Sequence, residues 1–536
     1  MRHRSFCGLL CGLQLGAGLL AGCDSGSSDV TRAVIASYSK AEFGTANRPQ
    51  TIPALRLWAP GQGEFAYSST SRIVIPSGGA ALTDTAALFV EDLWVLTGNT
   101  HTVANGTPGK GDIHLRLGRP DSELGEEGYE LNIGEAAVIT APTAAGVFYG
   151  TRSLLQLLRQ NDTIPAGIAR DWPRYPERGL MVDIGRMHFS VQWLSNHIRE
   201  LAWLKLNYLH LHFSDNEGWR IESQTHPEIV STPHLSKAEV RELIALAARH
   251  HITVVPEIDM PGHMTAALAP HPEFQLANLL GQREADKLDV SNDDARTYAR
   301  ELISEYLELF PGPYWHMGAD EYLGIVSTAL NYQLYPQLQD YARAKHGAAA
   351  NHKDAVLDFI NEINSFVRSH GKTMRVWHDG LGGGHAVTVP NNIVVEVWNE
   401  FAGAQPPELL SAGHKIMNCG WYPTYYTQHV FSLIRPNMKP AYETWDVFQF
   451  HGPLELYEPI GLPPTEIDPD EPLNLGSKIH VWSDVPQFDD ENGVAEGIYP
   501  RLRMLAQKTW NSEKLVGSYE EFQAIMDAAE RAPGYQ

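Results

Sequence analysis

The 536-residue sequence has little cysteine, few basic residues and few long apolar runs. Four cysteines are too few for the disulfide framework of a small secreted scaffold. Lys and Arg number 41 against 64 Asp and Glu, a net charge of -23, and no basic stripe is present. Such a charge repels nucleic acid and anionic membrane surfaces, so we expect no nucleic-acid partner and a neutral or cationic substrate. Acidity that only keeps the protein soluble is an equal alternative.

The one notable apolar run lies at the N-terminus, where two arginines precede a small-residue stretch at 6–21. It is too short and too Gly-rich for a membrane span, so it predicts an export signal. The run ends in Leu20-Ala21-Gly22-Cys23, which resembles a bacterial lipobox. This resemblance implies cleavage before Cys23, acylation of its thiol and a membrane-anchored lipoprotein in the periplasm or on the cell surface. An ordinary signal peptide is the alternative.

The remaining cysteines agree with export. Cys7 and Cys11 would leave with the signal peptide, residues 1–22, and Cys23 would carry the lipid. Residues 23–44 begin polar and Ser-rich, as expected of a flexible tether. Cys419 is then without a partner, so we expect no intramolecular disulfide.

Two regions of different patterning follow the tether. Residues 45–170 have the pattern of a small α+β domain, in which a helix is expected at Ala144–Arg159. Four short strands are expected before it, at Ser71–Pro76, Ile113–Gly118, Tyr129–Ile133 and Ala137–Thr140. A Pro-punctuated linker at 171–176 then opens the second region, 171–536.

In the second region, short apolar strands alternate with amphipathic helices such as Val191–Leu204 and Lys237–His250. Eight strands are expected, at Gly179–Ile184, Asn207–Ser214, Thr253–Asp259, Tyr314–Asp320, Thr373–Asp379, Ile393–Asn399, His414–Cys419 and Lys478–Asp484. Eight such units predict an α/β protein with a (β/α)₈ barrel. A Pro-rich insert at about 450–474 either shapes the site entrance or is an addition to the barrel without a role in the site.

Functional groups of such a barrel gather where its strands end. The expected strand ends carry one arginine, three carboxylates, one histidine and three tryptophans: Arg186, Asp215, His263, Asp320, Glu321, Trp377, Trp398 and Trp482. Indole faces stack on the C–H faces of a pyranose, and charged groups bind hydroxyls in pairs. The set is therefore typical of a sugar-binding site.

Four motifs carry a family resemblance. The segment from His316 to Glu321, His-Met-Gly-Ala-Asp-Glu, resembles the H-x-G-G-D-E signature of family 20 β-N-acetylhexosaminidases. Segments 178–186, 209–215 and 256–263 are similar to that family's first three strands, and residues 128–131 and 146–150 to its N-terminal domain. The resemblance spans about residues 45–515. It implies an exo-acting hydrolase that releases terminal non-reducing β-linked N-acetylglucosamine or N-acetylgalactosamine, without cofactor or metal.

The carboxylates also bear on mechanism. Most retaining glycosidases place an acid and a nucleophile on opposite sides of the anomeric carbon, and the adjacent Asp320 and Glu321 are poorly suited to that. Family 20 uses the substrate's 2-acetamido oxygen instead, through an oxazolinium ion. By resemblance, Glu321 is the general acid and base and Asp320 orients the acetamido group. Asp215 and His263 would form a hydrogen-bonded pair behind Glu321.

The resemblance also assigns substrate-binding residues. Trp377, Trp398 and Trp482 would wall the acetamido pocket, and Tyr425 would donate to the acetamido oxygen. Arg186 would hold the sugar's outer hydroxyls, and Asp484 would share that task.

The sequence departs from the family's pattern at a few positions. Ala319 stands where Gly is usual, Asp484 where many members have Glu, and Thr427 lacks the expected side chain. The first two departures also resemble lacto-N-biosidases, which release a disaccharide by the same chemistry. Arg186 favours the monosaccharide, whereas the shorter Asp484 opens space for a second sugar.

Two functions of other classes remain open. His210 and His212, with Asp215 and His263, suggest a metal site of the amidohydrolase kind, although barrel packing also explains histidines inside a strand. A non-catalytic sugar-binding lipoprotein is the other alternative, which the retained Asp320-Glu321 pair disfavours.

Overall fold

The computed structural model describes residues 43–44, 47–323, 332–400, 402–427, 438–450, 465–510 and 514–536. Cys23, the predicted signal peptide, nearly all of the tether and most of the Pro-rich insert lie outside them. Across the described ranges, no helix has the length and apolar character needed to span a bilayer.

The N-terminal part is a seven-stranded sheet with the order β1-β7-β5-β6-β4-β2-β3. The helix α3 (Ala144–Gln160) packs on it, capped by Thr143, whose side chain accepts from the Gly146 N–H. The predicted helix and four strands are all present, and three strands and α2 (Thr83–Thr97) were not predicted. The strands are β1 (Leu57–Ala66), β2 (Ile73–Ile75), β3 (Val103–Asn105), β4 (Ile113–Leu117), β5 (Tyr129–Ile133), β6 (Ala137–Ala141) and β7 (Thr163–Asp171).

Eight parallel strands then close into a barrel, because β20 pairs with both β8 and β16. The strands are β8 (Glu177–Asp183), β9 (Tyr208–His212), β10 (Thr253–Met260), β13 (Tyr314–Gly318), β14 (Thr373–Trp377), β15 (Val394–Val397), β16 (Ile416–Asn418) and β20 (Asn474–Trp482). All eight were predicted, with bounds that differ by a few residues. The (β/α)₈ barrel and the α/β class are therefore confirmed.

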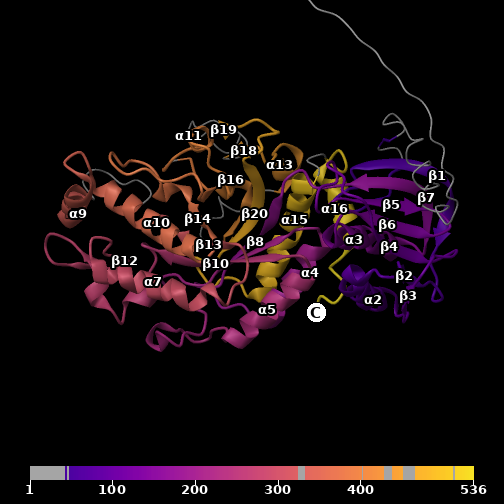
Figure 1. Cartoon of the computed structure of the whole chain (residues 1–536), viewed down its shortest axis with the longest axis horizontal. Helices are drawn as coiled ribbons and strands as arrows, with labels where there is room; N and C mark the ends of the chain where they lie inside the picture. Colours follow the sequence, from indigo (N-terminus) through magenta and orange to yellow (C-terminus); the bar gives the residue numbers. More distant parts are fainter. Residues whose placement is uncertain are drawn as a thin grey trace, which may run out of the picture.

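Helices and short extra strands surround the barrel (Figure 1). The helices are α4 (Val191–Trp203), α5 (Lys237–Arg249), α6 (Thr265–Leu268), α7 (Asp293–Leu307), α9 (Pro336–His346), α10 (His352–Ser369), α11 (Pro406–Ser411), α12 (Trp421–Thr424), α13 (Met438–Glu443), α15 (Glu491–Trp510) and α16 (Tyr519–Ala529). The extra strands are β11 (Gln275–Ala277), β12 (Arg283–Leu288), β17 (Tyr425–Thr427), β18 (Gln449–Phe450) and β19 (Thr465–Glu466).

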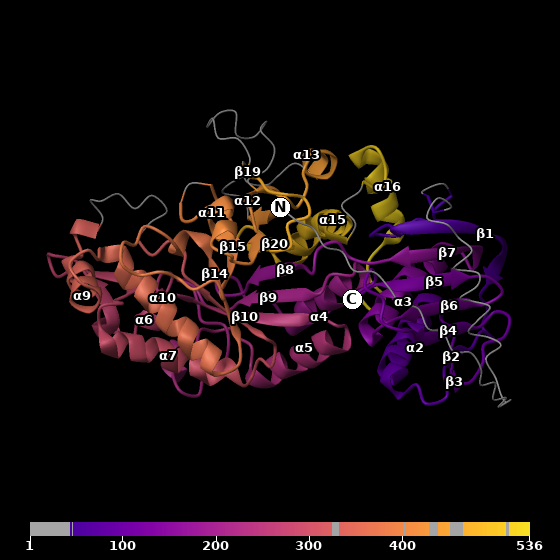
Figure 2. The same cartoon turned by 45° about the horizontal axis from the view of Figure 1, so that its top comes forward.

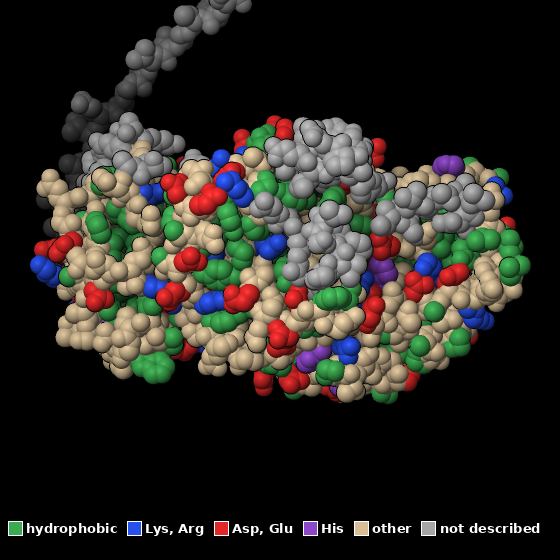
Figure 3. Space-filling model, turned by 180° about the vertical axis from the view of Figure 1, so that it is seen from behind, with side chains coloured by type: hydrophobic (Ala, Val, Ile, Leu, Met, Phe, Trp, Pro, Cys, Tyr) green, Lys and Arg blue, Asp and Glu red, His purple; other side chains and the backbone are tan. Residues whose placement is uncertain are grey.

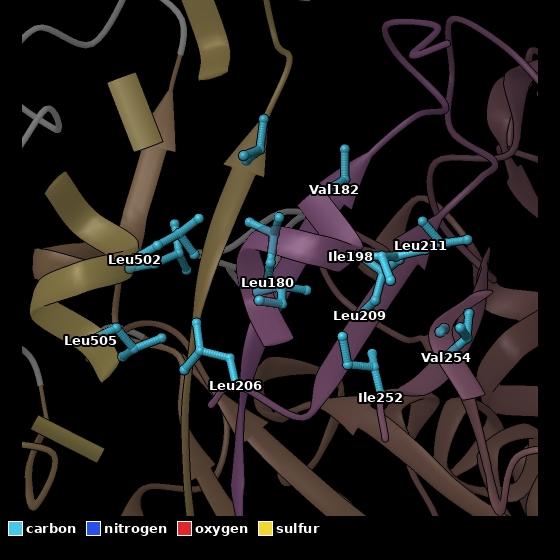
Figure 4. Close-up of a cluster of buried hydrophobic side chains, with 14 of the residues drawn as sticks. Leu180, Val182, Ile198, Leu206, Leu209, Leu211, Ile252, Val254, Leu502 and Leu505 are labelled. Carbon is cyan, nitrogen blue, oxygen red and sulfur yellow. The ribbon is translucent and has the colours of Figure 1, made fainter. Parts of the chain in front are cut away.

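Alternation along each strand separates the apolar layer from the barrel interior. Figure 4 shows Leu180 and Val182 of β8 with Leu209 and Leu211 of β9, in the layer that holds Ile198 of α4 and Leu502 and Leu505 of α15. Burying each such side chain contributes roughly 1.5–3 kcal/mol. The residues between them therefore point into the barrel, because side chains alternate along a strand.

The barrel interior is filled by paired charges. Arg375 Nη1 lies 2.8 Å from Glu177 Oε2 and its Nε 2.6 Å from Glu396 Oε1. Lys478 Nζ lies 2.6 Å from the other oxygen of Glu396 and 2.9 Å from His210 Nδ1. All of these side chains are buried, so each charge needs its partner.

The sheet and the barrel lie at opposite ends of an elongated molecule (Figures 1 and 2). Asp171, the last residue of β7, joins them: it accepts from Lys205 Nζ at 2.8 Å and from Trp510 Nε1 at 2.8 Å. The predicted linker thus begins one residue inside a strand. On the face seen in Figure 3, acidic and basic side chains are interspersed.

Candidate active site

The end of β13 turns sharply to present two carboxylates. Gly318, Ala319 and Glu321 all have positive φ, of 73°, 78° and 49°. A Cβ on Gly318 would lie 1.7 Å from Asp259 Oδ1, so only glycine fits there. Left-handed backbone costs a non-glycine residue about 1–2 kcal/mol, and such strain gathers at functional sites.

Glu321 is the accessible carboxylate of the pair, with its side chain 33% exposed. Its Oε2 lies 3.2 Å from His263 Nε2, and its backbone N–H donates to Asp379 Oδ2 at 2.9 Å. The carboxyl group therefore faces solvent while its main chain is held in place.

His263 contacts Asp259, and the predicted hydrogen bond between Asp215 and His263 is wrong. Nδ1 of His263 lies 2.7 Å from Asp259 Oδ2 and 3.7 Å from Asp320 Oδ2. His263 has a positive φ of 54° and lies three residues beyond the end of β10, which contains Asp259. Burial lowers the pKa of His263, but the charges of Asp320 and Asp259 raise it well above its ordinary value. The imidazolium therefore keeps its proton and places a positive charge 3.2 Å from the Glu321 carboxyl.

Asp215 belongs instead to a neighbouring charge cluster. It lies 2.9 Å from Arg186 Nη2 and 2.8 Å from His212 Nε2. Although burial opposes it, the Arg186 charge and the His212 hydrogen bond hold the pKa of Asp215 below its ordinary value. Asp215 is thus an ionised anchor for Arg186.

Arg186 presents its whole guanidinium to carboxylates. Nη1 lies 2.9 Å from Asp183, Nη2 contacts Asp215, and Nε lies 3.6 Å from Glu217. The guanidinium carbon lies 5.3 Å from the Trp482 ring, which places the group at the aromatic wall. Asp484 is exposed nearby, and its charge acts on Arg186. A sugar hydroxyl would have to share these donors.

Four predicted aromatic residues come together. Ring centroids lie 5.8 Å apart for Trp377 and Trp482, 5.9 Å for Tyr425 and Trp482, and 6.5 Å for Trp398 and Tyr425. Tyr425 lies in β17, which pairs with β20, and the charges of Asp320 and Glu321 act on its hydroxyl. The aromatic wall therefore stands beside the two carboxylates.

Asp379 and Glu257, which were not predicted as site residues, orient these tryptophans. Asp379 accepts from Trp398 Nε1 at 2.9 Å and from the Glu321 N–H, and Glu257 accepts from Trp377 Nε1 at 2.8 Å. Burial, aided by the Glu321 charge, raises the pKa of Asp379 to about 6. Asp379 ends the predicted fifth strand and Glu257 lies within the third. Their inward-facing positions on these strands were therefore the sequence signal that could have identified them as site residues.

Asp320 is the buried carboxylate, with its side chain 10% exposed. Burial and the nearby charge of Asp259 raise its pKa well above the ordinary value. Among the described residues, no group donates a hydrogen bond to its buried Oδ1. This oxygen can therefore accept a hydrogen bond from a ligand N–H, and a cationic ligand beside it would favour the ionised carboxylate.

The histidines suggested as metal ligands have other partners. His210 lies between Lys478, 2.9 Å from Nδ1, and Glu257, 2.9 Å from Nε2. His212 places its nitrogens 2.7 Å from Glu257 and 2.8 Å from Asp215. The Lys478 ammonium repels a cation, and His212 must carry both protons to donate to two carboxylates. Barrel packing therefore explains this pair.

A cavity of about 360 Å³ opens beside Glu321. Asp379, Lys353 and Glu408 join Glu321 as its charged lining residues, and residues 380–383 and 402–404 also line it. It can therefore take a polar group next to the Glu321 carboxyl.

Comparison with known proteins identifies the family. Residues 175–513 match the model of the glycosyl hydrolase family 20 catalytic domain, and residues 48–172 match that of domain 2 of the same family. A lacto-N-biosidase of Bifidobacterium bifidum is 31% identical over 95% of this chain and 44% of its own length. A β-hexosaminidase of Porphyromonas gingivalis is 28% identical over 72% of this chain and 51% of its own length. The chain therefore spans about half the length of these two relatives.

A solved structure has the same fold. The family 20 exo-β-N-acetylglucosaminidase of Vibrio harveyi, in complex with N-acetylglucosamine, superposes with a TM-score of 0.71 at 20% identity, covering 90% of this chain and 76% of that one. The matched models cover both parts of the molecule, the sheet and the barrel. The chain belongs to glycosyl hydrolase family 20.

Proposed function

We propose that this protein is an exo-acting glycosidase that releases terminal non-reducing β-linked N-acetylhexosamine from an amino-sugar glycoconjugate. The observation that carries the proposal is Asp320 Oδ1, a buried carboxylate oxygen without a donor among the described residues, beside an aromatic wall and the accessible Glu321. A 2-acetamido group supplies the missing N–H and an apolar methyl for the indoles.

The first step of the reaction is substrate-assisted. The acetamido N–H donates to Asp320 while the acetamido oxygen attacks C1. The bond from C1 to the leaving oxygen breaks, and Glu321 gives that oxygen its proton. Asp320 then faces a cationic oxazolinium ion, whose charge it stabilises.

The second step returns the proton. Glu321 takes a proton from water as the water attacks C1, and the bond between C1 and the acetamido oxygen breaks. The acetamide is restored and the sugar keeps its anomeric configuration. The His263 imidazolium, 3.2 Å from Glu321, stabilises the carboxylate between the two steps.

Glu321→Gln tests this assignment. The variant should lose several orders of magnitude in kcat on chitobiose, because poor leaving groups need the proton, and lose less on an activated aryl glycoside. A thiazoline mimic of the oxazolinium ion should inhibit the parent much more tightly than N-acetylglucosamine does. Near-parental hydrolysis of chitobiose by the variant, or a covalent glycosyl adduct on an Asp or Glu, would overturn the mechanism. Absence of any turnover by the parent would favour a non-catalytic sugar-binding protein.

Release of a disaccharide is the second candidate. It is supported by the engagement of Arg186 with three carboxylates, which leaves fewer donors for outer hydroxyls, and by the similarity to a lacto-N-biosidase. The test compares kcat/KM on the p-nitrophenyl β-glycosides of N-acetylglucosamine and lacto-N-biose. Faster cleavage of the second, with the disaccharide released intact, would replace the first proposal by this one.

We also propose that the protein is an exported lipoprotein anchored through Cys23. The support is the Leu20-Ala21-Gly22-Cys23 sequence and the Ser-rich segment after it. The parent should incorporate labelled fatty acid and partition into detergent, and Cys23→Ser should do neither. An unlabelled parent would refute the anchor and leave the enzymatic proposal untouched.

A further inference from the structure

Two His-Pro-Glu tripeptides, at 226–228 and 271–273, face each other on the barrel's loops. Each histidine precedes a single 3-10 turn that begins with proline, Pro227–Ile229 or Pro272–Phe274. The two histidines have nearly the same backbone, with φ and ψ of -131° and 64° at His226 and -124° and 58° at His271. The first loop follows β9 and the second follows β10, and they meet near α6 and α7 at the end of the molecule away from the N-terminal sheet (Figures 1 and 2).

The side chains of these tripeptides converge on one carboxylate oxygen. Glu228 Oε1 lies 3.1 Å from His226 Nδ1 and 3.0 Å from His271 Nε2. All three atoms lie within 4.8 Å of one another. Zinc bonds of 2.0–2.1 Å in tetrahedral geometry separate neighbouring ligand atoms by about 3.3–3.4 Å. An ion could therefore bind if the distances from Glu228 Oε1 to the two nitrogens, 3.1 and 3.0 Å, opened by a few tenths of an ångström and the two imidazoles moved to tetrahedral positions around it.

Further carboxylates face the outer nitrogens of both rings. Glu273 Oε1 lies 3.4 Å from His271 Nδ1, and Glu301 Oε2 lies 3.8 Å from His226 Nε2. At these distances the two carboxylates form no hydrogen bond with the rings, but their negative charges favour a cation at the cluster. They are also placed where a carboxylate can accept from the outer N–H of a metal-binding imidazole.

Aromatic packing holds the two imidazoles in place. The Tyr298 ring of α7 lies 5.0 Å from each of them, and Phe274 stacks on His271 with centroids 5.8 Å apart. The His226, His271 and Glu228 side chains are 13%, 22% and 39% exposed. The cluster is therefore ordered by its neighbours and open to ions from solvent.

We propose that His226, His271 and Glu228 bind one divalent transition-metal ion of the zinc class, with water in the remaining position. Imidazole nitrogens favour zinc and its neighbours, whereas calcium and magnesium require oxygen ligands. The ion would cross-link the loops after β9 and β10, which carry Asp215 and His263. These loops are already joined by the Thr265 hydroxyl, which donates to Asn216 Oδ1 at 2.7 Å. The ion would therefore have a structural role and would take no part in the proposed hydrolysis.

The test uses the full chain, purified without a polyhistidine tag and freed of metal by chelation. Zinc titrated by calorimetry should bind one ion per chain with micromolar or tighter affinity and should raise Tm by a few degrees. His226→Ala and His271→Ala should each weaken binding at least tenfold. His234→Ala is the matched control, from the same loop as His226, and should bind zinc as the parent does. Cobalt bound to the parent should show the absorption of a tetrahedral ion.

The metal-free His226→Ala variant should hydrolyse an aryl glycoside at the parental rate, which separates this site from catalysis. If the parent binds zinc no more tightly than a variant that carries both His226→Ala and His271→Ala, the cluster is an ion-pair network and the proposal is wrong. An equal Tm shift from magnesium or calcium would overturn it in the same way. Should an alanine variant fail to fold, Glu228→Gln, which keeps the side chain's size but loses its charge, must still weaken zinc binding.

Discussion

Replacing Asp379 by asparagine tests how the backbone of Glu321 is held. The carboxylate accepts two hydrogen bonds, from the Glu321 N–H and from Trp398 Nε1, both at 2.9 Å. Asparagine keeps one acceptor oxygen and turns an NH₂ group toward the second donor. Loss of a hydrogen bond to a charged group costs about 1.5–3 kcal/mol. We therefore expect Asp379→Asn to be less stable than the parent and to have a lower kcat, because Glu321 or Trp398 shifts.

The stability difference should also depend on pH, with a sign that burial dictates. Burial raises the pKa of Asp379 from its ordinary 3.8 to about 6, so the folded state binds the proton more tightly than the unfolded state. The resulting stabilisation is fully present below the unfolded pKa and is lost as pH rises through 6. Because protonation and folding are coupled, this stabilisation is larger at pH 5 than at pH 7.5 by about 1.4 kcal/mol, and it approaches about 3 kcal/mol at still lower pH. Asparagine lacks this contribution.

Urea denaturation at pH 5 and pH 7.5, followed by tryptophan fluorescence, measures the effect. The stability advantage of the parent over Asp379→Asn should grow by about 1.4 kcal/mol at the lower pH. Asp354→Asn is the control: backbone N–H groups, including those of Asn351 and Ala386, hold the pKa of Asp354 below its ordinary value despite burial. Its difference from the parent should stay constant over this range. A constant difference for Asp379→Asn, or one that shrinks at pH 5, would refute the reasoning.

Three further substitutions test the site. Asp320→Asn should lower kcat by orders of magnitude and weaken thiazoline binding, because it removes the charge facing the intermediate; unchanged inhibition would contradict this role. Glu257→Gln should lower stability by about 3–5 kcal/mol and raise KM, since buried His212 loses a counter-charge and Trp377 an anchor; a parental Tm would contradict it. Gly318→Ala should abolish activity, since its Cβ would overlap Asp259. Gly347→Ala, where positive φ occurs in open space, should lose only about 1–2 kcal/mol of stability and keep activity.

The barrel could be predicted from sequence because its strands are apolar, short and regularly spaced. β1 was missed because Pro60 and Gly61 interrupt it, and five of its residues are exposed in a row. Most of the site could also be predicted from the strand ends, since parallel strands alone place Asp320, Glu321 and the tryptophans at the same end of the barrel. The partner of His263 could not be predicted this way. His263 has a positive φ and its ring contacts Asp259, and neither a left-handed backbone nor a contact of that kind leaves a periodic signal in the sequence.

The paired charges inside the barrel limit which substitutions a redesign of its interior can use. Arg375 bridges Glu177 and Glu396, and Lys478 shares Glu396 with it, so a library that varies one of these positions at a time mostly samples unpaired charges in a buried interior. Such variants should be recovered as unfolded protein whatever their effect on the chemistry. Simultaneous exchange of a whole ionic group for apolar residues of similar volume is often neutral or stabilising by 1–4 kcal/mol. The productive unit of change in this interior is therefore the charge group itself, which joins β14 and β15 to the non-adjacent β8 and β20, and selections should be built to vary those positions together.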